Sequence, residues 1–124
     1  VVLRAIHSLP PEISGATDWR SGLAGVQAWR ERQPQGRPLV LAGDFNSSWG
    51  HPGFRGIAET MTDAQHAAGG TWAPTWPQGR RLIRPFIQLD HVLTRGLGVV
   101  DAGVVPLPKT DHAAVWARLS SHPT

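Results

Sequence analysis

Short apolar segments alternate along the chain with polar stretches that are rich in glycine and proline. Residues 1–6 and 39–42 are mostly apolar runs of the kind that forms buried strands. Between them, apolar residues recur at helical spacing from residue 17 onward, and Pro34 ends this pattern. The pattern therefore predicts a strand, a helix and a second strand, in this order.

The rest of the chain continues this alternation of short elements and turns. We expect a short helix over residues 54–60 and an ordered loop over residues 66–80, which are rich in Gly, Pro and Trp. Three more strands are predicted over residues 86–93, 99–105 and 113–119, followed by a tail over residues 121–124. Strands and helices in this order indicate one mixed α/β or α+β unit.

The composition limits the class of protein. The chain has 124 residues, of which 40% are apolar, so a single domain over residues 1–124 can bury a core. It has no apolar run of about 18 residues that would span a bilayer. The absence of cysteine excludes disulfides, thiolate nucleophiles and cysteine-based metal sites. A net charge of +3 does not by itself indicate a nucleic-acid partner. Because the chain begins with Val1 inside a predicted strand, we expect it to be part of a longer protein.

Acids, amides and imidazoles stand at or near the ends of four predicted strands. They are His7, Asp44, Asn46, Asp90, His91, Asp111 and His112. A sheet whose strand ends carry such groups can bring them together in one pocket. Carboxylates suit Mg²⁺, and an imidazole oriented by a second carboxylate can donate to a phosphoryl oxygen. The set therefore indicates metal-assisted hydrolysis of a phosphate ester.

Each of these residues also has an ordinary structural interpretation. An Asp-x-Asn sequence after a strand is often only a turn, and an Asp-His pair before a strand is common in loops. Asp90 lies in an apolar segment and needs a partner, for which an arginine is an alternative to an active-site group. Trp72 and Trp76 either stack on a substrate ring or pack a long loop onto the core. The cluster of Arg80, Arg81 and Arg84 either contacts a polyanion or is solvated.

Four segments together resemble the endonuclease/exonuclease/phosphatase superfamily, which includes deoxyribonuclease I. The segments are 7–10 (His-Ser-Leu-Pro), 41–46 (Leu-Ala-Gly-Asp-Phe-Asn), 88–93 (Gln-Leu-Asp-His-Val-Leu) and 110–112 (Thr-Asp-His). The superfamily fold is a four-layer αββα sandwich, and this chain resembles its C-terminal half, with a mixed, largely antiparallel sheet. The first half supplies an Asn and the main metal-binding Glu. The only glutamates of this chain, Glu12, Glu31 and Glu59, lie outside an equivalent setting.

The resemblance implies roles for the residues of the second and first segments. Asp44 would orient or activate the attacking water, or protonate the leaving group. Asn46 would hold the scissile phosphate. His7 matches a position that is His in the deoxyribonuclease I and phosphatase branches, which favours these branches over a base-excision role.

The resemblance also implies roles for the third and fourth segments. Asp90 would pair with His112 and fix its orientation. His112 would contact the phosphoryl oxygen, and Asp111 would contribute to metal binding. The implied cofactor is Mg²⁺, with Mn²⁺ as an alternative.

The resemblance leaves the substrate and the assembly open. Nucleic acid, inositol phosphate and phospholipid headgroups are all phosphate esters that this superfamily hydrolyses. A non-catalytic binding or scaffolding module of the same fold is the alternative to a phosphodiesterase, nuclease or phosphatase. Half a sandwich leaves an apolar sheet face, so we expect either the missing N-terminal half or self-association to cover it. The local sequence is similar to a bacterial subset, in which membrane contact would come through segments outside this chain.

Overall fold

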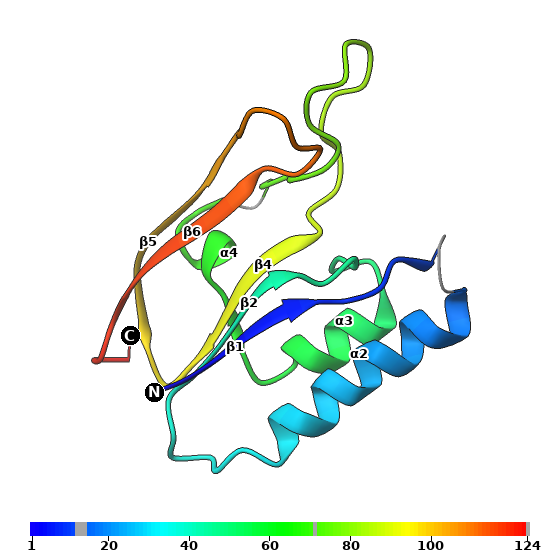
Figure 1. Ribbon diagram of the computed structural model, residues 1–124. Helices are drawn as coiled ribbons and strands as arrows, with labels where there is room; N and C mark the ends of the chain where they lie inside the picture. The colour runs from blue at the N-terminus through cyan, green and yellow to red at the C-terminus, as the bar shows by residue number, and fades with distance from the viewer. Residues whose placement is uncertain (12–14, 71, 124) are drawn as a thin grey trace.

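The computed structural model describes residues 1–11, 15–70 and 72–123 (Figure 1). Glu12 and the last residue of the predicted tail, Thr124, therefore lie outside the described residues, as does Thr71 in the predicted loop. The elements are β1 (Val2–His7), α2 (Ala16–Glu31), β2 (Leu39–Asp44), α3 (Pro52–Ala58), β3 (Thr62–Asp63), α4 (Ala64–Ala67), β4 (Asp90–Arg95), β5 (Gly98–Val105) and β6 (Ala114–Ser120).

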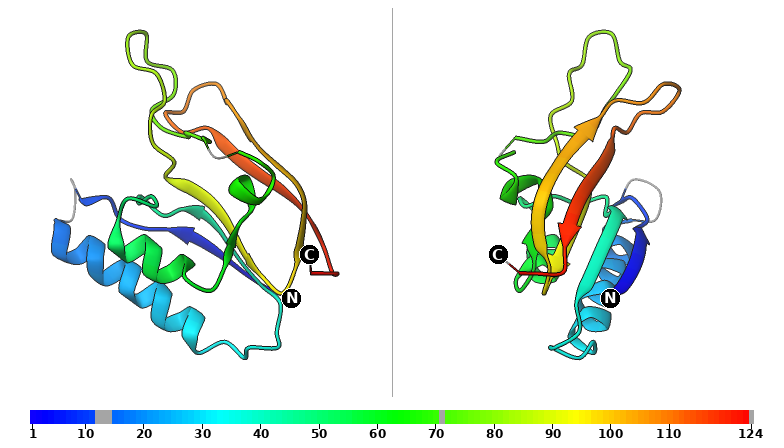
Figure 2. Two further views of the ribbon diagram at one scale, coloured as in Figure 1. Left: turned by 180° about the vertical axis from the view of Figure 1, so that it is seen from behind. Right: turned by 90° about the vertical axis from the view of Figure 1, so that its left-hand side faces the viewer.

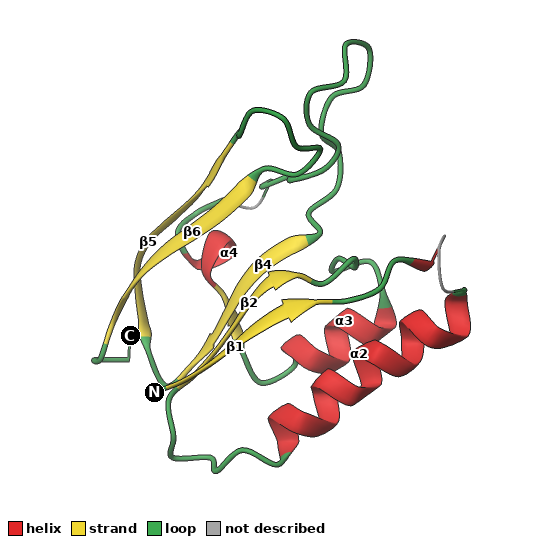
Figure 3. Ribbon diagram, in the orientation of Figure 1, coloured by secondary structure: helices red, strands yellow, loops and turns green. Residues whose placement is uncertain are grey.

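A four-stranded sheet forms the middle of the fold, with strand order β1-β2-β4-β3. β1 runs parallel to β2, whereas the β2–β4 and β3–β4 pairs are antiparallel. α2 and α3 cover one face of this sheet, and the antiparallel β5–β6 hairpin lies on the other (Figures 2 and 3). The expected mixed, largely antiparallel architecture is confirmed.

β2 is buried on both faces, which explains why its sequence is a continuous apolar run. Leu39 and Leu41 pack against the two helices, in a cluster that includes the fully buried rings of Phe45 and Phe54. Val40, on the opposite face, packs against the β5–β6 hairpin. The central strand is therefore fixed from both sides, and so is the polar segment that follows it.

The helices and most strands begin and end close to the predicted positions. The longest helix, α2, buries Leu23 and Val26, two of the apolar residues that recur at helical spacing. Arg30 of the same helix is also buried, and its Nη1 donates to the carbonyl oxygen of Ile57 at 2.6 Å, which ties α2 to the end of α3. None of the described helices is long and apolar enough to cross a membrane.

The predicted strand over residues 86–93 is wrong at its start, because β4 begins only at Asp90. Residues 86–89 run beside the loop at Trp76, with a single bridge between Trp76 and Ile87. The Oγ1 atom of Thr75 accepts from the backbone N–H of Leu89 at 3.0 Å, so this apolar segment pairs with a loop. The two-residue β3 and the four-residue α4 were not predicted, since such short elements show no periodicity.

Gly43 allows β1 and β2 to approach each other just before the polar end of β2. Its φ angle is +138°, and a Cβ at this position would overlap the carbonyl oxygen of Ile6 on β1. An L-residue would therefore require both an unfavourable backbone conformation and a separation of the two strands. The position of Asp44, the next residue, depends on this close approach.

We predict that Gly43→Ala lowers the free energy of unfolding by about 2 kcal/mol or more, because strain and overlap act together. Urea denaturation followed by circular dichroism measures the change. Gly25→Ala is the matched control, since Gly25 lies in α2 with open space around its Cα. There the same substitution should stabilise the fold by up to about 1 kcal/mol. Equal effects at the two positions would contradict the role assigned to Gly43.

Candidate active site

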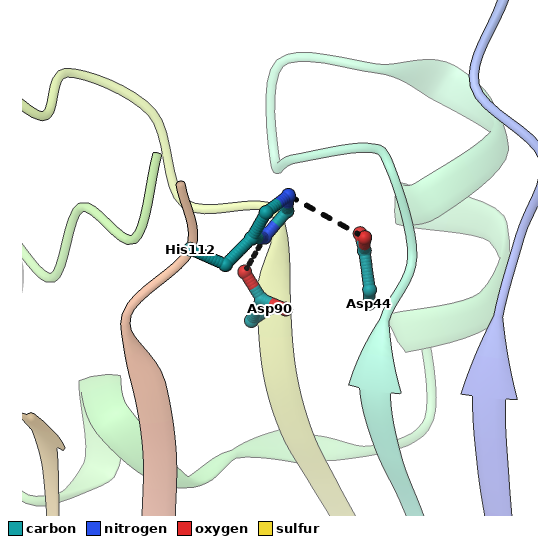
Figure 4. Close-up of side chains that lie close together, drawn as sticks. All are labelled: Asp44, Asp90 and His112. Atoms are coloured by element: carbon teal, nitrogen blue, oxygen red, sulfur yellow. Dashed lines mark hydrogen bonds and ion pairs between the residues drawn. The ribbon is translucent and has the colours of Figure 1, made fainter. Parts of the chain in front are cut away.

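Three polar side chains meet at the end of the sheet where β2 stops and β4 starts (Figure 4). Asp44 is the last residue of β2, Asp90 is the first residue of β4, and the antiparallel register places the two opposite each other. His112 precedes β6 and points its ring between the two carboxylates. Segments far apart in the sequence are thus brought together by strand pairing.

The His112 imidazole links the two carboxylates. Its Nδ1 lies 2.7 Å from Oδ2 of Asp90, a short distance for a hydrogen bond to a carboxylate. Its Nε2 lies 3.6 Å from Oδ2 of Asp44. Because Asp90 accepts from Nδ1, the Nε2 atom is left to face Asp44 and the space beyond it. The expected contact between Asp90 and His112 is present, and the partner of Asp90 is this histidine rather than an arginine.

Asn46 is fixed by three hydrogen bonds around a left-handed backbone conformation with φ 45°. Its N–H donates to Oδ1 of Asp44 at 2.8 Å, its Nδ2 donates to the carbonyl oxygen of Ser8 at 2.6 Å, and its own carbonyl accepts from Nε1 of Trp19 at 3.0 Å. The Asp-x-Asn segment is therefore a turn and also holds both side chains at the site. The turn and site interpretations are compatible.

A pocket of about 490 Å³ opens in front of these groups. Asp44, Asn46 and His112 are among its polar residues, and His7 lies at its edge with an 84% exposed side chain and Nε2 4.0 Å from Oδ2 of Asp44. The apolar part of the wall comes from Pro10, Pro11, Trp19, Trp76, Phe86, Ile87 and Leu89. The pocket thus joins polar groups at its base to an apolar wall, as small-molecule sites commonly do.

Asp111 lies in the same pocket, but its carboxylate has a partner of its own. Trp76 Nε1 donates to Oδ2 of Asp111 at 3.2 Å. Trp76 therefore belongs to the pocket wall, whereas Trp72 is 70% exposed and lies outside this pocket. The sequence allowed both tryptophans either to stack on a substrate ring or to pack a loop onto the core. Of the two, only Trp76 lies in the pocket where such a ring could bind.

Burial and mutual contacts shift the pKa values of two site residues upward. Burial raises the pKa of Asp44, and the nearby charge of Asp90 adds to this effect, against the hydrogen bond from the Asn46 N–H and the charges of His112 and His7. Burial alone would lower the pKa of His112, but the hydrogen bond to Asp90 and the charges of Asp90, Asp44 and Asp111 outweigh it and raise the pKa above 6.5. The site therefore favours a protonated imidazole beside a carboxylate that can accept a proton.

The site offers donors for a metal ion. Ligand atoms of Asp44, Asp90 and His112 all lie within 4.8 Å of one another. Carboxylate oxygens are the donors that Mg²⁺ prefers, and one or two of them suffice when substrate and water supply the rest. Asp111 is outside this group of three, although it lines the same pocket. The two carboxylates of this group therefore fit a hard divalent cation, whereas His112 is no ligand while its imidazole is protonated.

His91, which the sequence placed with the other polar residues, points away from the pocket into the core. Its Nδ1 lies 3.3 Å from Oδ2 of Asp63, its Nε2 lies 2.8 Å from the carbonyl oxygen of Ser47, and its ring stacks on Phe54. Trp49 Nε1 also donates to Asp63, at 2.8 Å. This buried network holds the backbone directly after Asn46.

Asp63 has a supporting role that the sequence pattern does not reveal. It lies in the two-residue β3, where no strand pattern is visible, and Trp49 and His91, which hydrogen-bond to its Oδ2, are 14 and 28 positions away. Burial alone would raise the pKa of Asp63, but the hydrogen bonds from His91 and Trp49 and the charges of His91 and His66 outweigh it and lower the pKa below 3.8.

We predict that Asp90→Asn lowers the pKa of His112, because it removes both the charge and the strongest hydrogen bond that favour the imidazolium. An NMR titration of the histidine ring protons measures this. In the unchanged protein His112 should titrate above 6.5. The His122 ring, which contacts Ser121 in the tail, serves as the internal control. An unchanged His112 titration would contradict the pairing of His112 with Asp90.

Asp63→Asn should destabilise the fold at neutral pH by about 3 kcal/mol, as expected when one partner of a buried ion pair is removed. The folded state lowers the pKa of Asp63. The stabilising effect of its carboxylate is therefore complete above pH 3.8, and it is lost as the pH falls through the pKa that Asp63 has in the folded state. The difference between variant and unchanged protein should therefore shrink in acid. Thermal unfolding at several pH values checks this, with the half-exposed Asp101→Asn as the control. A difference that does not depend on pH would argue against an ionised Asp63.

Comparisons with solved structures show the same fold in larger proteins. A mannosyl-6-phosphatase of Bacteroides thetaiotaomicron has a TM-score of 0.74 at 16% identity and matches 94% of this chain but 50% of its own. Danio rerio TDP2, solved with a single-strand DNA product, has a TM-score of 0.70 at 13% identity and matches 95% of this chain and 55% of its own. An endonuclease/exonuclease/phosphatase of Beutenbergia cavernae has a TM-score of 0.67 at 21% identity, and it matches 97% of this chain and 35% of its own.

The chain thus spans about half the length of the first of these structures. At such identities the likeness shows the fold alone. No curated protein sequence matches the chain. The model of the Endonuclease/Exonuclease/phosphatase family matches residues 2–112, which include every residue of the pocket. The chain belongs to the endonuclease/exonuclease/phosphatase family.

Proposed function

We propose that this chain forms part of a metal-dependent phosphoester hydrolase, with His7, Asp44, Asn46, Asp90 and His112 as its catalytic residues. The observation that carries the proposal is the His112 ring held between Asp90 and Asp44 at the base of a pocket. The reaction is attack of water on phosphorus in line with the leaving oxygen.

His112 and Asp90 act as a unit in this proposal. Asp90 holds Nδ1, so Nε2 can donate to a phosphoryl oxygen on which negative charge develops. The hydrogen bond to Asp90 and the nearby carboxylates raise the pKa of His112, which favours this donor in its protonated form. Asp90 itself orients the ring and need not touch the substrate.

Asp44 and Asn46 act on the other reactants. Asp44 orients the attacking water and accepts its proton, a role that its raised pKa favours. Asn46 uses one N–H of its Nδ2 on the carbonyl oxygen of Ser8, and the second N–H is left to donate to the phosphate. His7 lies at the exposed rim, where it can contact the same phosphate group.

The proposed cofactor is Mg²⁺, with Mn²⁺ as the alternative. Asp111 is the carboxylate that we propose as the metal ligand of this chain, because it lies in the pocket next to His112. When bound, the ion would act as a Lewis acid that polarises the phosphoryl oxygen. The hydrogen bond from Trp76 engages Oδ2 of Asp111 and leaves Oδ1 able to bind the ion.

Residues outside this chain would complete the site. The chain spans about half of the first solved structures, and the resemblance places a metal-binding Glu in the other half. In β1, Val2 and Ile6 pack against the helices, so Leu3 points to the opposite face, where it is 68% exposed. We infer that the missing half of the fold, or a second copy of the chain, covers this part of the sheet.

A non-catalytic binding module is the second candidate function. Among the described residues, the pocket contains no glutamate, which favours a module that binds a phosphate group without hydrolysing it. The two functions differ in turnover, while both require the same pocket.

Hydrolysis of bis(p-nitrophenyl) phosphate and p-nitrophenyl phosphate, with Mg²⁺ or with EDTA, tests the proposal. The assay uses this chain and any longer protein that contains it. We expect Mg²⁺-dependent turnover that Asp44→Asn and His112→Ala each lower by at least about a hundredfold. Arg118→Gln, at an exposed position on β6, is the control. Full activity in either site variant would contradict the roles assigned, and phosphate binding without turnover in the longer protein would favour the module.

A further inference from the structure

A loop over residues 79–86, which we call the tip loop, protrudes beyond the end of the sheet where the pocket lies. It is the yellow-green segment that extends farthest from the sheet in Figure 1, and both views of Figure 2 show the same projection. Its base is fixed, because the N–H of Gln78 donates to the carbonyl oxygen of Asp111 at 2.7 Å and the N–H of Phe86 donates to that of Trp76 at 3.0 Å. The two ends of the tip loop are therefore held by backbone hydrogen bonds, while its middle is exposed.

The tip carries large apolar side chains in the open. Leu82 is 93% exposed, the highest value among the large apolar residues described, and Ile83 and Phe86 are 48% and 54% exposed. Single exposed apolar residues are common on protein surfaces, but a group of them on a protruding loop marks a contact site. The tip loop therefore presents an exposed apolar surface.

The apolar tip is flanked by positive charge. Arg80 and Arg81 precede Leu82, and Arg84 follows Ile83, while no acid occurs from residue 79 to residue 89. All three arginines are exposed, and none of the ion pairs among the described residues includes them. Asp44 and Asp90 lie on strand ends, and Asp111, whose carbonyl oxygen accepts from Gln78, lies at the base of the loop, so the arginines set the charge near the tip.

We propose that the tip loop docks this protein on an anionic lipid surface. Leu82 and Ile83 enter the boundary between headgroups and acyl chains, and Arg80, Arg81 and Arg84 bind the headgroup phosphates. A single-stranded nucleic acid would satisfy the arginines, but its bases stack on aromatic or guanidinium planes. Phe86 and the three arginines offer such planes, but Leu82 and Ile83 do not, and burial in an apolar medium accounts for the exposure of these two aliphatic side chains.

Docking would place the pocket next to the lipid surface, because Phe86 belongs both to the tip loop and to the pocket wall. Resting on the proposed hydrolase function, this geometry makes a phosphate ester carried by a lipid the expected substrate class. The docking itself does not depend on hydrolysis, and it is tested without it.

Co-sedimentation with lipid vesicles tests the docking in the 124-residue chain. We expect binding to phosphatidylcholine vesicles that contain about one third phosphatidylglycerol, weaker binding to pure phosphatidylcholine, and a further loss in high salt. The triple variant R80Q/R81Q/R84Q should bind about a hundredfold more weakly, at about fivefold for each arginine. The matched control R20Q/R32Q/R37Q removes the same charge from exposed positions on and beyond α2. Equal losses in the two triple variants would overturn the proposal, as would equal binding to both vesicles.

A second measurement reports the position of the tip. The chain has no cysteine, so Leu82→Cys creates a single site for an environment-sensitive fluorophore. Its emission should shift to the blue with anionic vesicles, while the same label at Gln35→Cys, in the exposed turn after α2, should not respond. Absence of a shift at residue 82 would show that the tip stays in water and would overturn the proposal.

Leu82→Ser separates a lipid surface from a nucleic acid. It keeps all three arginines, so it should lower vesicle binding severalfold and leave the binding of a single-stranded oligonucleotide unchanged. The proposal would be overturned if Leu82→Ser left vesicle binding unchanged and the unchanged protein bound the oligonucleotide more tightly than it bound vesicles. Loss of this oligonucleotide binding in the arginine triple variant would then identify a nucleic-acid contact. Since none of these measurements requires turnover, an inactive pocket would not affect the result.

Discussion

The arrangement of the site depends on one strand register, which sets Asp44 directly opposite Asp90. Two carboxylates that face each other on neighbouring strands repel, so the register is tolerable only with a cation or a proton between them. His112 supplies both a positive charge and two ring nitrogens at this point. The interaction that makes the sheet end stable is thus the same one that we propose as the source of the acid and base of the pocket.

The structure supports this register from two sides of the sheet. On one side, the close approach at Gly43 and the turn at Asn46 fix the exit of β2. On the other, the buried pair of Asp63 and His91 holds the carbonyl of Ser47. A left-handed backbone conformation and a crowded strand pair occur within two residues of Asp44, and the buried pair contacts Ser47, three residues after it. Such costly features persist where packing around them is strong, and in this fold they surround the candidate active site.

Much of the fold could be predicted, because the elements that matter are long enough to show periodicity. The apolar run of β2 and the helical spacing of α2 each bury a continuous face, and this burial is what the sequence pattern records. The start of β4 was misplaced because Phe86 and Ile87 are apolar for a different reason, as wall residues of a pocket rather than strand residues. The short β3 lacked any pattern, and Asp63 was missed with it.

The site was predictable as a set of residues but not as a geometry. Strand ends that carry Asp44, Asp90 and His112 suggested a common pocket. Alternation along β4 turns His91 to the face opposite Asp90, where its ring stacks on Phe54 in the core. The pairing of β3 with β4 brings Asp63 to His91, a long-range contact that no local pattern shows.

Phe86 gives this arrangement a thermodynamic consequence, because one side chain borders both the pocket and the protruding loop. If a contact at the loop shifts this ring, it changes the affinity of the pocket for its ligand by some factor. A ligand in the pocket must then change the affinity of the loop for its own contact by the same factor, since the coupling free energy is shared. Two surfaces that differ in chemistry would in this way be linked through a single aromatic ring.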